Sequence, residues 1–75
     1  MELVKMFGDG ENEFVPTKAQ ESKLRLLMER FSADRVRAFS DTYEGWVLLV
    51  FEDSKNGEWC HYMTVGVGPE GDSHT

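Results

Sequence analysis

The 75-residue sequence has one cysteine, two histidines and no apolar run longer than six residues. A lone Cys60 cannot form an internal disulfide, on which small secreted domains commonly depend. No segment approaches the roughly 20 apolar residues of a membrane-spanning helix. Glu2 stands where a signal peptide would carry basic residues. We therefore expect a cytoplasmic protein that does not bind membranes.

Few residues have the chemistry of a catalytic or metal site. Cys60 and His61 are adjacent, so on a strand they face opposite sides and cannot act together as nucleophile and base. A zinc site would have to recruit carboxylates. The literal G-x-G-x-x-G at Gly66, Gly68 and Gly71 is followed by only four residues, too few for the helix that would hold a pyrophosphate. We predict no enzyme, no cofactor and no bound metal, and keep a small enzyme or metal protein as an alternative.

Acidic side chains outnumber basic ones by 14 to 8, which gives a net charge of −6. This charge argues against direct binding to nucleic acid. Residues 17–31 contain four basic and two acidic side chains, so the other 60 residues together carry −8. The negative charge is therefore concentrated outside the candidate helix.

Asp9, Glu11 and Glu13 alternate with small or polar residues. In an extended backbone their carboxylates would lie on one side, about 6.8 Å apart. Three interpretations are open: a weak divalent-cation site that lacks the EF-hand order of ligands, an acidic row that imitates the nucleic acid backbone and occupies a basic groove, and a solvated loop.

The chain is long enough for one domain, and 40% of its residues are apolar, as in globular proteins. We place the domain at residues 1–67. Residues 68–75 contain no apolar anchor, so we expect a disordered tail there.

The first half of the chain predicts a strand and a helix. A short strand over residues 3–7 is followed by a turn at residues 8–10, where two glycines permit positive φ. Thr17 followed by Gln20 fits a capping box at the start of a helix. One apolar stripe then recurs with helical spacing, at Leu24, Leu27, Met28 and Phe31.

The second half predicts strands. Residues 35–43 could form a strand or a helix, and their β-branched and aromatic content favours a strand that turns at Glu44-Gly45. Asn56-Gly57 between two apolar runs indicates a β-hairpin. The predicted fold class is α+β, with one helix packed on a small antiparallel sheet in the order β-α-β-β-β.

A two-residue turn would place Lys55 opposite Glu58 and Phe51 opposite Tyr62. One sheet face would then hold Trp46, Leu48, Val50, Trp59, His61, Met63 and Val65. The other would hold Val47, Leu49, Phe51, Cys60, Tyr62 and Thr64. We expect the helix on the bulkier first face, which leaves the second as an interface, although a three-residue loop with Gly57 as a bulge would change these sets.

These patterns favour a small acidic protein-binding module, an inhibitor that blocks a nucleic-acid-handling partner by charge mimicry. The alternative is a homodimeric structural or regulatory module that uses the second sheet face. The candidate partner-binding residues are Asp9, Glu11, Glu13, Leu49, Phe51 and Tyr62.

Overall fold

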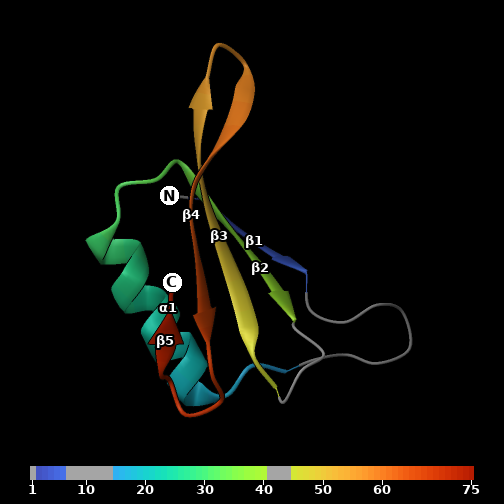
Figure 1. Cartoon of the computed structure of the whole chain (residues 1–75), viewed down its shortest axis with the longest axis vertical. Coiled ribbons are helices and arrows are strands. Elements are labelled where there is room, and N and C mark those ends of the chain that lie inside the picture. Colours follow the sequence, from blue (N-terminus) through green and yellow to red (C-terminus); the bar gives the residue numbers. More distant parts are fainter. Residues whose placement is uncertain (1, 7–14, 41–44) are drawn as a thin grey trace.

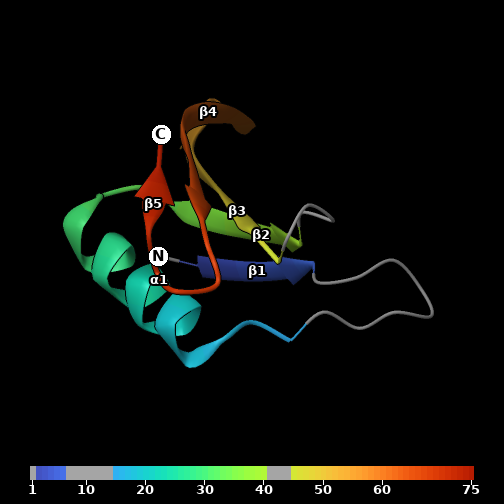
Figure 2. The same cartoon turned by 60° about the horizontal axis from the view of Figure 1, so that its bottom comes forward.

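The computed structural model describes residues 2–6, 15–40 and 45–75 (Figure 1). One sheet has the strand order β1-β2-β3-β4-β5, in which β1 runs parallel to β2 and all other pairs are antiparallel. Figures 1 and 2 show α1 on one face of this sheet. The predicted α+β class and the order β-α-β-β-β are confirmed, with a short strand added at the end. The elements are β1 (Glu2–Met6), α1 (Lys18–Arg30), β2 (Arg35–Ser40), β3 (Val47–Lys55), β4 (Glu58–Val67) and β5 (Ser73–His74).

Within the segment over residues 35–43, Arg35–Ser40 is a strand, and residues 41–43 lie outside the described residues. The turn expected at residues 8–10, and Glu44 of the turn expected at Glu44-Gly45, lie outside the described residues. Because β1 and β2 run parallel, the chain has to cross over between them, and α1 forms part of that crossover.

Helix α1 begins where the capping box predicts. The Thr17 hydroxyl accepts the Gln20 backbone N–H at 3.1 Å, and Gln20 Oε1 accepts the Thr17 N–H at 2.9 Å. The side-chain amide of Gln20 also donates to the carbonyl oxygens of Gly45 and Val67, at 2.7 and 3.2 Å. These bonds allow the polar Gln20 side chain to be buried at the start of the helix.

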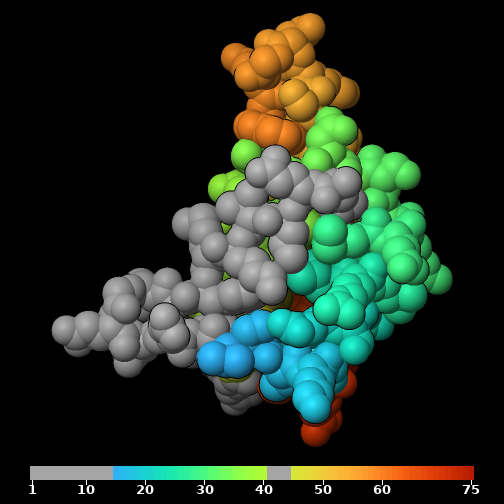
Figure 3. All heavy atoms as spheres, turned by 180° about the vertical axis from the view of Figure 1, so that it is seen from behind, coloured from blue at the N-terminus to red at the C-terminus, as the bar shows by residue number. Residues whose placement is uncertain are grey.

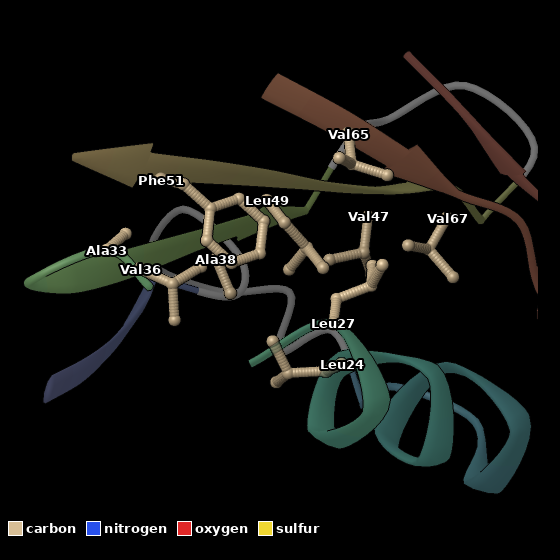
Figure 4. Packing of buried hydrophobic residues seen from close by; sticks show 10 residues of the cluster. All are labelled: Leu24, Leu27, Ala33, Val36, Ala38, Val47, Leu49, Phe51, Val65 and Val67. Carbon is tan, nitrogen blue, oxygen red and sulfur yellow. The ribbon is translucent and has the colours of Figure 1, made fainter. Parts of the chain in front are cut away.

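The helix covers the sheet face opposite to the one expected. Leu24 and Leu27 of α1 pack in one cluster with strand residues that point toward the helix, as Figure 4 shows. The assignment of Trp46, Leu48 and Val50 to the helix side was therefore wrong. The buried apolar residues of β2, β3 and β4 are Val36, Ala38, Val47, Leu49, Phe51, Val65 and Val67.

The reason for this choice of face lies in β2. Val36 and Ala38 pair with Phe51 and Leu49, so the middle of that face is apolar across both strands. Arg35 and Arg37 stand on the other face, and burying two guanidinium groups under a helix would cost far more free energy than leaving apolar side chains half-exposed. The prediction placed the helix on the face with the bulkier side chains, and the charge of the arginines should have decided the face instead.

The hairpin has the predicted turn but not the predicted register throughout. Asn56 and Gly57 have φ values of 52° and 79°, as a type I′ turn requires, and Lys55 pairs with Glu58. The register then shifts between Phe51 and Glu52, so that Met63, rather than Tyr62, pairs with Phe51. This β-bulge turns Met63, Val65 and Val67 toward the helix, whereas Trp59 stays on the other face.

The expectation of a disordered tail was also wrong. The backbone N–H of Gly68 donates to the Asp72 carbonyl at 2.8 Å, and β5 then pairs with β4 at Gly66 and Val67. The Thr17 hydroxyl donates to the Pro69 carbonyl at 2.7 Å. Backbone hydrogen bonds and the hydroxyl of the helix cap therefore hold residues 68–75 in place. The prediction looked for apolar anchors, and hydrogen bonds of this kind leave no apolar signal in the sequence.

Candidate interaction surface

The sheet face that turns away from α1 carries the polar and aromatic side chains left out of the core. We call it the open face. Strand alternation and the observed register place its members on β2, β3 and β4. They are Arg35, Arg37, Phe39, Leu48, Val50, Glu52, Trp59, His61 and Thr64.

A three-residue ion cluster lies at the centre of the open face. Glu52 is 6% exposed, and its Oε1 accepts hydrogen bonds from Arg35 Nε at 2.9 Å and Arg37 Nε at 2.6 Å. Arg37 Nη2 also donates to Glu52 Oε2 at 3.1 Å. Burial by itself raises the pKa of the Glu52 carboxyl, but the hydrogen bonds and charges of the two arginines outweigh it, so the pKa lies below its ordinary value. Glu52 is therefore ionised at neutral pH.

The ion cluster also positions an exposed aromatic residue. The guanidinium carbon of Arg35 lies 3.8 Å from the ring centroid of Trp59, within cation–π range. Arg37 lies over the ring of Phe39 at 5.2 Å. Trp59 is held by this stacking yet remains 43% exposed. The indole is thus a large, oriented side chain available at the surface.

Trp59 stands on the exposed end of the β3–β4 hairpin. We call residues 54–62 the hairpin arm, because each of them is exposed to solvent. Figure 3 shows this part of the chain, in orange, projecting from the rest of the molecule. At the base of the arm, Asp34 Oδ2 accepts the Ser54 N–H at 2.7 Å and Asp53 Oδ1 accepts the Asp34 N–H at 3.2 Å. These bonds fix the direction of the arm relative to β2.

The predicted site residues do not gather in one place. Asp9, Glu11 and Glu13 lie outside the described residues. Leu49 and Phe51 are 1% and 0% exposed in the core under α1, so they do not form a free surface. Tyr62 is 51% exposed and stands on the helix side of the arm, where its ring centroid lies 6.5 Å from that of Phe31.

The sequence prediction grouped the apolar and aromatic members of β3 and β4 on the open face but placed them under the helix, and it did not identify Arg35, Arg37 and Glu52 as site residues. The alternation of Arg35 and Arg37 with Val36 and Ala38 was a usable signal, since it marks one apolar and one charged side of a strand. The alternation does not indicate which carboxylate the two arginines bind, because Glu52 belongs to another strand.

Across residues 2–6, 15–40 and 45–75, no three His, Cys, Asp or Glu side chains come together as a metal site would require. Nor is any described helix long and apolar enough to cross a membrane.

The geometry therefore consists of a fixed ion cluster, a stacked tryptophan and an exposed arm, which together can contact another macromolecule. Compared with family models, curated proteins and solved structures, the chain matches none of them.

Proposed function

We propose that the protein is a small acidic protein-binding module that contacts its partner through the hairpin arm and the adjoining open face. The observation that carries the proposal is Trp59, which is 43% exposed and held by Arg35. Tryptophan and arginine are the residues most enriched among those that dominate binding energy at protein interfaces. Binding without catalysis is the activity that we propose.

The ion cluster supports this proposal through its effect on the entropy of binding. A flexible arginine or tryptophan loses rotamer freedom when a partner binds, and this loss opposes association by about 0.5–1.5 kcal/mol per side chain. Arg35 is already held by Glu52 at 2.9 Å and Trp59 is already stacked on Arg35. Both side chains therefore lose less freedom on binding.

Leu48 adds apolar area to the same face. It is 37% exposed on β3, and Phe39 is its neighbour on β2. A contact with apolar and aromatic residues at its centre and charged residues around them has the composition of a protein interface.

We further propose that the partner is a nucleic-acid-handling protein and that the module inhibits it by charge mimicry. The charge of −8 outside residues 17–31 supports this mode, and Asp9, Glu11 and Glu13 supply a regular row of carboxylates in the sequence. Such a contact weakens as salt rises, because exposed charges are screened over about 8 Å at physiological ionic strength.

The test of the contact surface compares two exposed apolar residues. Trp59 on the arm is 43% exposed and Leu26 on α1 is 49% exposed. Immobilised wild-type protein, Trp59→Ser and Leu26→Ser are used to capture partners from a lysate. We expect Trp59→Ser to lose a partner that Leu26→Ser retains, and the reverse pattern would refute the assignment of the arm.

The test of charge mimicry uses the same capture at low and high salt. Replacing Asp9, Glu11 and Glu13 by Asn or Gln removes three charges while keeping side-chain size. We expect capture by the wild type to fall steeply with salt, and the triple variant to associate more slowly. Capture that survives both high salt and the triple replacement would leave the acidic row as a solubility feature.

A further inference from the structure

The outer edge of β4 is uncovered over most of its length. Strand β5 pairs with Gly66 and Val67 alone. In the described part of the chain no other strand pairs with the outer side of β4, and residues 58–62 are all exposed. An uncovered edge presents backbone N–H and C=O groups to any chain that can add a further strand.

The backbone direction at this edge follows from Glu52. Its carbonyl accepts the N–H of Asp34 at 3.0 Å, so the backbone groups of Glu52 are directed toward β2. His61 pairs with Glu52, and alternation along an antiparallel ladder then directs the N–H and C=O of His61 away from β3. The same holds for Trp59, two residues earlier. Trp59 and His61 therefore supply the free donors and acceptors of the edge.

The edge also lacks the residues that commonly prevent pairing between strands. Between positions 58 and 65 there is no lysine, arginine or proline, and Glu58 is the sole Asp or Glu. The bulge beside Tyr62 interrupts the regular strand, so the regular part of the edge ends at His61.

We propose that a second copy of this chain occupies the edge, with the two β4 strands antiparallel about a two-fold axis at Cys60. In this register Trp59 of each copy pairs with His61 of the other, which uses all four outward backbone groups of each edge. A shift toward the turn would bring Gly57 into the ladder, where its φ of 79° is not extended. A shift in the other direction would bring in the bulge at Tyr62. The register centred on Cys60 is therefore the one that forms two complete pairs.

The charges and rings of the edge fit this arrangement. Glu58 of one copy lies opposite Tyr62 of the other, so the edge carboxylates do not face each other. Trp59 and His61 form cross-strand aromatic pairs on one face, a kind of pair that stabilises antiparallel sheets. Figure 3 shows that the hairpin arm projects from the rest of the molecule, so two copies can pair through their arms while their domain bodies stay apart.

The area available makes the dimer weak. Trp59 and Tyr62 expose 43% and 51% of their surfaces, and an aromatic side chain has about 200 Å² to bury. Two copies therefore bring about 400 Å² of aromatic surface to the contact, against the roughly 1,200 Å² of a stable interface. We expect a dissociation constant on the order of 100 μM. This self-association goes beyond the proposed function, since binding of a partner does not require it.

Cys60 allows the register to be tested directly. On the axis of an antiparallel pair, the two Cys60 Cα atoms would be about 4.5 Å apart, within the range for a disulfide. The control is Glu58→Cys in a Cys60→Ser background, on the same exposed arm, where the two Cα atoms would be about 14 Å apart. Oxidised glutathione is the oxidant: two thiols form one disulfide, and the glutathione disulfide is reduced to two glutathione molecules. We expect the wild type to form covalent dimers at least about tenfold faster than the control.

Equal rates at the two positions would indicate random collision, and faster reaction of the control would indicate another register. Either result, or no covalent dimer at all, would overturn the proposal. His61→Pro provides an independent variant, because proline removes an outward N–H while leaving the bonds to β3 in place. We expect sedimentation equilibrium at 100–500 μM to show dimers, on the scale of the expected constant, for the wild type and not for His61→Pro. Dimers that persist in a folded His61→Pro protein would also overturn the proposal.

Discussion

Replacing Leu48 and Leu49 one at a time by alanine measures which sheet face the helix covers. The two residues are neighbours on β3 and undergo the same chemical change, but they lie on opposite faces. Leu49 is 1% exposed beneath α1, and Leu48 is 37% exposed on the open face. If the helix covered the bulkier face, Leu48→Ala would be the more damaging change. In the observed fold, Leu49→Ala is expected to be the more damaging change.

The size of the difference follows from burial. Removing three carbon atoms from a fully buried leucine loses about 2.4 kcal/mol of transfer free energy, and the cavity that remains brings the total to about 3–4 kcal/mol. At Leu48 about two-thirds of that transfer term applies, or roughly 1.5 kcal/mol, and water fills the space. We therefore expect Leu49→Ala to lower the free energy of unfolding by about 2 kcal/mol more than Leu48→Ala does.

Urea titration followed by tryptophan fluorescence and by circular dichroism measures both variants. A domain of 75 residues has a free energy of unfolding of roughly 4–11 kcal/mol, so Leu49→Ala remains folded in water unless the wild type lies at the lower end of this range. Its melting temperature should fall by about 15–25 °C. Equal destabilisation by the two replacements, or a larger effect at Leu48, would refute the assignment of the core face.

Three further predictions concern the ion cluster, the helix cap and the hairpin turn. The lowered pKa of Glu52 means that the unfolded chain takes up a proton first as pH falls below the ordinary 4.5, so the cluster stabilises the fold above that pH and this contribution is lost as pH falls through the lowered folded value. Glu52→Gln should therefore flatten the acid limb of stability against pH in urea titrations, and an unchanged limb would contradict the role of Arg35 and Arg37. Thr17→Ala should lower the free energy of unfolding by about 1 kcal/mol, whereas Thr17→Ser should keep most of the capping stabilisation, because serine also carries a hydroxyl. Gly57→Ala should lower the free energy of unfolding by about 1–2 kcal/mol in thermal melting, because a φ of 79° is unfavourable for a residue with a side chain. No clash adds to this cost, since the added Cβ meets no other atom within 4 Å. A neutral effect would mean that the turn relaxes.

The features that the sequence predicts correctly are set by neighbouring residues. Thr17 and Gln20 are three positions apart, and Asn56 and Gly57 are adjacent, so each pair carries its own geometry. The alternation of Arg35 and Arg37 along β2 was a local signal for the sheet face. The ion cluster was not predictable in this way, because Glu52 lies 17 and 15 residues from the two arginines. The bulge at Tyr62 depends on how Met63 packs against the core, which no local pattern encodes. The same limits apply to the interaction surface. Trp59 was predicted to lie under the helix, and the arginine that orients it on the opposite face was not identified as a site residue.

The buried amide of Gln20 has a consequence for the order of folding. It joins the start of α1 to the carbonyl of Gly45, 25 residues away, and to that of Val67, 47 residues away. While the end of β4 is missing, the helix start holds a buried donor that lacks one of its acceptors, which opposes closure of the core. Contacts of such long range form late and slow the folding of a chain. We therefore expect a chain that lacks the end of β4 to have a less stable start of α1, because the Gln20 amide then has one acceptor fewer.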